Sequence, residues 1–134
     1  MKSIAEIVAA LDGAGEAIRA ADARVGAAYR ALANDPSSAG RSAAAEAVRA
    51  KRDLIHTLRR RIGATPAAGE TEHARALTVR ALKLWEDGLT ASARALRVER
   101  ADQRDAEARE AERLLERAGE AVLESRAALR LRRL

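Results

Sequence analysis

The chain has 134 residues, a length that suits one domain with a core of modest size. It contains 35 Ala and 22 Arg but one Trp, one Tyr and no Phe, which argues against a thick aromatic core or a β-sandwich. It has no Cys, so disulfides and thiolate metal sites are excluded. Ala, Arg, Glu and Leu dominate, as is typical of long helices and coiled coils.

The formal net charge is +5, and it is distributed unevenly. Residues 1–33 are neutral, residues 34–69 have a net charge of +4, and residues 70–134 have a net charge of +1. A basic excess in one segment invites a nucleic-acid interpretation for that segment alone. A GC-rich coding bias, which favours Arg over Lys, is an alternative source of the same excess. No long apolar run or basic leader is present, so we expect a cytoplasmic protein without membrane insertion.

The first predicted element is a helix over about 3–33. Ser3 followed by Glu6 matches a capping box at its start. Large apolar residues recur at seven-residue spacing through Ile4, Leu11, Ile18, Val25 and Leu32. Alanines fill the companion heptad position at Ala14, Ala21 and Ala28. This alternation of large and small side chains predicts closely packed helices.

The second predicted helix covers about 41–62, after a break of polar residues and Pro36. Gly63 is the expected left-handed residue at its end. One face of this helix is cationic, and its candidate phosphate-binding residues are Arg49, Lys51, Arg52, Arg59 and Arg60. A solvated face, or pairing with acidic residues of a neighbouring helix, explains the same pattern. No aromatic residue lies among them, so base stacking is not expected.

The third predicted helix covers about 70–132. Its apolar seam runs through Leu77, Leu84, Leu115, Val122 and Leu129, with small residues between them. The seam slips by one residue within 99–105, and this slip predicts a stammer, a bend or a turn. Because the stretch contains no Gly or Pro, a continuous helix is favoured over a helix that folds back there. Trp85 is expected to anchor the core or an interface.

A continuous rod of this length would be only partly covered by the first two helices. Its exposed seam would then need a second chain, which predicts a homo-oligomer or another helical partner. Rows of opposite charge flank that seam: arginines at Arg109, Arg113 and Arg117, and glutamates at Glu112, Glu116, Glu120 and Glu124. Such rows fix register and orientation between helices, or serve only solubility.

Two acid-x-x-His pairs, Asp53 with His56 and Glu70 with His73, match half of the ligand pattern of metal-binding four-helix bundles. Nearby Arg52 and Arg59 would repel a cation, so both histidines are expected to be exposed and idle. Neither a nucleophile elbow nor a phosphate loop is present. We therefore expect no catalytic, metal or cofactor site, and no enzymatic activity.

These observations predict an all-α protein, an antiparallel bundle or coiled coil of three long helices with the last one bent or split near 99–105. The expected function is that of a non-catalytic scaffold or adaptor that self-associates and contacts other proteins. The alternative is a small nucleic-acid-binding accessory protein that uses the second helix. A metal-binding bundle is the remote third interpretation.

Overall fold

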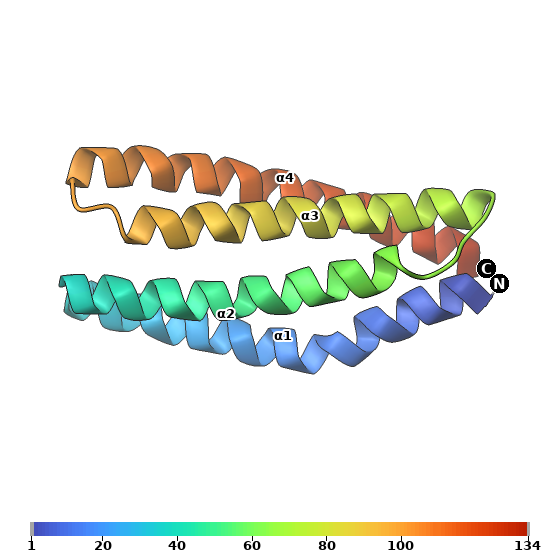
Figure 1. Ribbon diagram of the computed structural model, residues 1–134, viewed down its shortest axis with the longest axis horizontal. Helices are drawn as coiled ribbons and strands as arrows, with labels where there is room; N and C mark the ends of the chain where they lie inside the picture. The colour runs from blue at the N-terminus through green and yellow to red at the C-terminus, as the bar shows by residue number, and fades with distance from the viewer. Residues whose placement is uncertain (1, 134) are drawn as a thin grey trace.

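The computed structural model describes the backbone of residues 2–133 and the side chains of residues 4–130. Four helices make up the described chain: α1 (Lys2–Asn34), α2 (Ser38–Gly63), α3 (Glu70–Leu96) and α4 (Ala101–Arg133). They form an antiparallel bundle, and the two ends of the chain lie at the same end of it (Figure 1). The predicted all-α antiparallel bundle is confirmed.

The favoured single helix over 70–132 is wrong, and the alternative in which the chain folds back is the one adopted. The chain leaves α3 at Arg97 and starts α4 at Ala101, inside the stretch where the heptads slip. Arg104 stabilises this turn, because its Nη1 donates to the carbonyl oxygens of Val98 at 2.8 Å and Glu99 at 3.3 Å. Folding back lets the small-residue faces of both halves bury each other within one chain.

The first two connections differ in detail from the prediction. α2 begins at Ser38 rather than at residue 41, because the Ser37 hydroxyl accepts the backbone N–H of Gly40 at 3.1 Å and acts as the N-cap. The helix ends at Gly63 as expected, but Gly63 is not left-handed, and the C-cap residue Ala64 is in a right-handed conformation. The glycine with positive φ is Gly69, directly before α3. The side chain of Ser3 lies outside the described residues, so the expected capping box is not tested.

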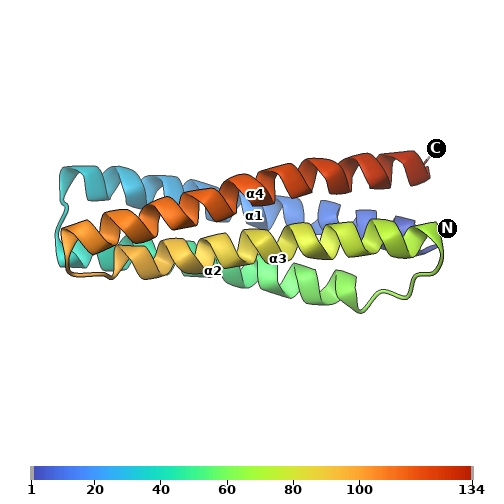
Figure 2. The ribbon, with the colours of Figure 1, turned by 90° about the horizontal axis from the view of Figure 1, so that it is seen from above.

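Each helix packs mainly on the helix that follows it in the chain: α1 on α2, α2 on α3, and α3 on α4. α1 and α4 hardly touch. Figures 1 and 2 show the two hairpins, α1–α2 and α3–α4, side by side along the molecule. The core lies between them, and its most completely buried large side chains are Ile7, Val48, Ile55 and Ile62. None of the helices, over the residues described, contains a stretch long and apolar enough to cross a membrane.

The α3–α4 interface is closely packed at Gly88. A Cβ built at Gly88 would lie 2.6 Å from Cδ2 of Leu115 and 3.3 Å from its backbone nitrogen, so α4 passes directly over the backbone of α3. Further along, the buried hydroxyls of Thr78 and Ser125 lie 2.8 Å apart across the same interface. The small side chains of Ala81 on α3 and of Ala111 and Ala118 on α4 are buried. The large/small alternation in the sequence thus serves contacts within the chain.

Candidate helix-docking groove

A groove opens along the bundle between α1 and α4, which make few contacts with each other. Its volume is about 500 Å³, and side chains of all four helices line it. The apolar lining comes from Val8, Leu11 and Ile18 of α1, Leu58 of α2, Leu82 and Trp85 of α3, and Val122 and Leu129 of α4. A lining of this composition favours contact with another apolar surface over contact with water.

The rim of the groove is charged, and its α4 edge is cationic. Asp12 and Arg19 border it on α1, while Arg126 and Arg130 border it on α4. All four residues are exposed. None of them forms an ion pair with another residue in the part of the chain that the structure describes. The α4 edge therefore presents two uncompensated positive charges beside an apolar floor.

Lys51 contacts two residues that line the groove, Asp22 and Trp85. Its Nζ is 2.5 Å from Oδ1 of Asp22 and 4.9 Å from the centre of the Trp85 ring. The Lys51 side chain is 14 % exposed, whereas that of Asp22 is 49 % exposed. A cation over an aromatic face is attractive, and more so where water is scarce. This contact joins α1, α2 and α3 at the point where the groove opens.

A second polar cluster lies between α2 and α3. Nδ1 of His56 and Nε of Arg59 each lie 2.7 Å from a carboxylate oxygen of Glu86. Burial alone raises the pKa of the Glu86 carboxyl, but hydrogen bonds and charge from Arg59 and His56 outweigh burial, so its pKa lies below the ordinary value. Glu86 is therefore ionised at neutral pH and bridges the two hairpins.

The structure separates the five candidate phosphate-binding residues. Arg59 pairs with Glu86, Lys51 with Asp22, and Arg52 with Asp53 at 2.7 Å. Arg49 lies 3.9 Å from Glu46, and Arg60 is exposed without an ion pair among the described residues. Four of the five cations thus have an ion-pair partner within the chain, and the five do not form one free surface. Nucleic-acid binding stays a prediction.

The predicted interface seam lies between helices of this one chain. Ile4 and Leu129 belong to the buried core, and Leu11, Ile18, Val25, Trp85 and Leu115 pack partly buried against it. Val122 lines the groove. Leu77 and Leu84 are half-buried. Because α4 covers α3, the uncovered rod from which we predicted a second chain does not exist.

The expectation that both histidines are idle is wrong for His56. Its partner is Glu86, thirty positions further along the chain, rather than Asp53. His73 is exposed. Among the residues that the structure describes, no three His, Cys, Asp or Glu side chains gather closely enough to hold a metal ion.

Sequence reasoning missed Glu86, although the sequence contains a signal for it. Glu86 lies four residues after Leu82 and three before Leu89, which places it on an apolar stripe of α3. A charged residue on such a stripe needs a partner from a neighbouring helix. Only the register of α2 against α3 identifies that partner.

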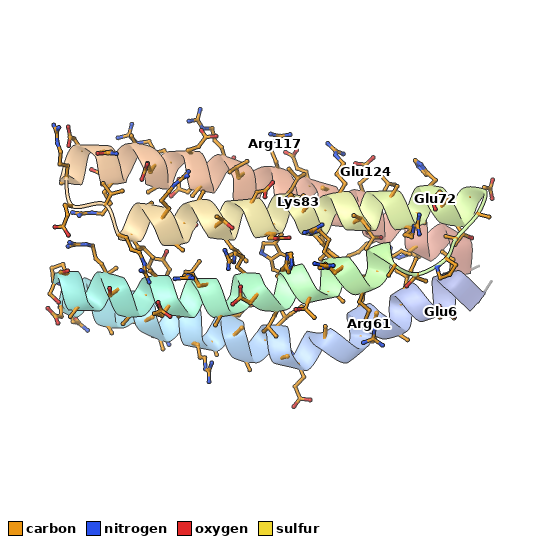
Figure 3. All side chains as sticks on the ribbon, viewed as in Figure 1. Glu6, Arg61, Glu72, Lys83, Arg117 and Glu124 are labelled. Atoms are coloured by element: carbon orange, nitrogen blue, oxygen red, sulfur yellow. The ribbon has the colours of Figure 1, made fainter. Side chains whose placement is uncertain are left out.

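Charged side chains stand along the outer surfaces of the bundle, and those of Arg117 and Glu124 point away from it on α4 (Figure 3). Comparison of the chain with protein-family models, with curated proteins and with solved structures finds no match in any of the three.

Proposed function

We propose that this protein is a helix-docking adaptor whose groove between α1 and α4 receives one amphipathic helix of a partner protein. The observation that carries the proposal is the lengthwise groove with an apolar lining, left open because the first and last helices make few contacts. A helix laid in an apolar groove is a recurring mode of peptide recognition. Its apolar stripe would replace the missing contact between α1 and α4.

The rim defines the chemistry of the partner helix. Arg126 and Arg130 lie one turn apart on the α4 edge, and neither is paired within the described residues. Acidic side chains beside the apolar stripe of the partner would face them and fix its orientation. The proposed partner is therefore an amphipathic helix with Leu or Ala on its apolar face and Glu along one flank.

The fluorescence of Trp85 can report binding, because it is the only Trp in the sequence and lines the groove. The probe is a synthetic helical peptide of about 20 residues, roughly 30 Å long, with a Leu/Ala stripe, Glu flanks and no aromatic residue. We expect saturable 1:1 binding by calorimetry, accompanied by a change in Trp85 emission. The same peptide with Lys in place of Glu should bind more weakly.

Two glycine variants make the test specific for the groove. Gly15 lines the groove, and a Cβ there would meet only the far end of the flexible Arg19 side chain, at 3.3 Å. Gly15→Leu should fill the groove and weaken peptide binding by roughly tenfold or more, without unfolding α1, because Leu is a better helix former than Gly. Gly13→Leu is the matched control, since Gly13 has open space around it and does not line the groove. Absence of binding to the native protein, or equal binding by both variants, would refute the proposal.

A further inference from the structure

The face of α4 that points away from the bundle carries an unusual charge pattern. Leu123 lies at its centre and is 66 % exposed, the highest value among the exposed large hydrophobic residues. At 3.6 residues per turn, a stripe of exposed residues shares this face. We call it the α4 outer face and define it by Glu116, Gly119, Glu120, Leu123, Arg126 and Arg130.

Charges on the α4 outer face are separated by sign. The glutamates at Glu116 and Glu120 precede Leu123, and the arginines at Arg126 and Arg130 follow it. Each pair is spaced i,i+4 with like charge, an arrangement that destabilises an isolated helix. None of the four forms an ion pair within the described residues. The face therefore carries one pair of negative charges and one pair of positive charges, and no ion pair within the described residues neutralises them.

The pattern is complementary to itself when one copy is reversed. Counting outward from Leu123, Glu120 and Arg126 are each three residues away, and Glu116 and Arg130 are each seven residues away. We propose that two copies of this chain associate through their α4 outer faces, antiparallel, about a two-fold axis at Leu123. Arg126 of one copy then stands level with Glu120 of the other, and Arg130 with Glu116. A two-fold interface requires this kind of self-complementary surface.

The residues beside Leu123 allow the two helices to approach closely. Gly119 has no heavy atom within 4 Å of where its Cβ would lie, so the space in front of it is open. Ala127, four residues after Leu123, is exposed and also has a small side chain. Small residues around a central Leu allow close helix packing, as within the α3–α4 interface of the bundle itself. A parallel pair is disfavoured, because it would bring glutamates level with glutamates and arginines level with arginines.

Association through this face shares Arg126 and Arg130 with the groove rim, but its other residues can be tested separately from peptide binding. Glu116, Glu120 and Leu123 do not line the groove, whereas Arg126 and Arg130 lie at the border between the two surfaces. Variants at Glu116 and Glu120 therefore test the dimer without touching the groove lining. Gly15→Leu, by contrast, should leave the dimer intact.

The experiment is sedimentation velocity of the full chain over a range of concentrations at low salt, with complementary charge variants. We expect the native chain to form a dimer as concentration rises. Glu116→Arg with Glu120→Arg makes the face wholly positive, and Arg126→Glu with Arg130→Glu makes it wholly negative, so each variant alone should be a monomer. An equimolar mixture of the two should regain the dimer mass.

The mixture also guards against misfolding, because two unfolded variants would not restore a defined dimer. Glu6→Arg with Glu16→Arg is the matched control on exposed positions of α1, and it should dimerise like the native chain. Leu123→Asp should abolish the dimer both in the native chain and in the mixture of charge variants. A native chain that is monomeric at all concentrations overturns the proposal. So does a dimer that survives both charge reversals, or a mixture that stays monomeric.

Discussion

Glu86 shows how a single side chain joins the two hairpins. Among the buried polar side chains of residues 4–130, Glu86 alone is charged, and α2 contacts both of its carboxylate oxygens. Arg59 and His56 are partly exposed, at 23 % and 41 % of their side chains. If Glu86 were removed, water could hydrate both of its partners, and this hydration limits the loss of folding stability. Charge-assisted hydrogen bonds of this kind contribute more than neutral ones, about 1.5–3 kcal/mol each before solvent screening.

The Glu86 cluster predicts a specific loss of stability in acid. Because the pKa of Glu86 is lower in the folded state than in the unfolded state, its contribution is full above the unfolded pKa and is lost as pH falls through the folded pKa. Glu86→Gln should reduce the free energy of unfolding by about 1–2 kcal/mol at pH 7. The difference from the native chain should shrink below about pH 4.

Urea unfolding followed by circular dichroism at pH 7 and at pH 3 measures both values. Glu112→Gln is the matched control, because Glu112 is exposed on α4 and forms no ion pair within the described residues. It should leave the stability nearly unchanged at both pH values. An equal deficit for Glu86→Gln at pH 3 and pH 7 would contradict an ionised, stabilising Glu86.

At the scale of the helices, the interface between α3 and α4 depends on the absence of a side chain at Gly88. Alanine normally stabilises a helix by about 1 kcal/mol relative to glycine. At this position, however, the added Cβ would meet the Leu115 side chain at 2.6 Å and its backbone nitrogen at 3.3 Å. The side chain can rotate, but the backbone can relieve its contact only if α4 moves outward.

We therefore expect Gly88→Ala to lower the free energy of unfolding by about 1–3 kcal/mol, the usual cost of overpacking. Gly119→Ala should raise it by up to about 1 kcal/mol, because space is open there and helix propensity alone acts. Parallel urea titrations of both variants, at a concentration where the chain is monomeric, provide the measurement. If Gly88→Ala were as stabilising as Gly119→Ala, the close approach of the two helices would be disproved.

Heptad spacing was enough to predict helices, antiparallel packing and the large/small seams, because burial of apolar residues follows the helical period directly. It was not enough to predict the turn at 97–100. That stretch has no Gly or Pro, and the turn forms because Arg104 binds two carbonyl oxygens and because two Ala-lined faces attract each other. Both causes depend on tertiary structure.

The groove was equally hidden in the sequence. Leu11, Ile18 and Val122 follow the heptad pattern like any core residue, and spacing alone cannot show that α1 and α4 stay apart. The partners of Lys51 and Arg59 could not be predicted either. Each depends on the relative register of two helices that are separated along the chain by a connection.

Over the whole molecule, burial is unevenly shared among the helices. The start of α1 is firmly fixed, with Ile4, Ile7 and Ala10 in the core. Over residues 11–34, the remainder of α1, Ala21 is the single residue that is fully buried. α3, by contrast, packs against both α2 and α4 along its length. Local stability follows this distribution of buried apolar contacts.

We therefore expect the backbone amides of residues 11–34 to exchange with solvent through local opening, at a lower free energy than the amides of α3. Native-state hydrogen exchange read by mass spectrometry measures this difference. The acidic amphipathic peptide should slow exchange in α1 when it binds in the groove, whereas the Lys-flanked peptide should have a smaller effect. Uniform protection across α1 and α3 would contradict separate opening of α1.

The pairwise order of the contacts also bears on how the chain folds. Every extensive interface joins two helices that are consecutive in the sequence. The core can therefore form by closing one short connection at a time, and topologies of this kind fold in about microseconds to milliseconds. A full interface between α1 and α4, which make few contacts here, would close the longest loop and carry the largest entropic cost. The bundle can therefore fold while the edge between α1 and α4 stays open. A helix from a partner protein can fill this edge without the entropic cost of closing the loop.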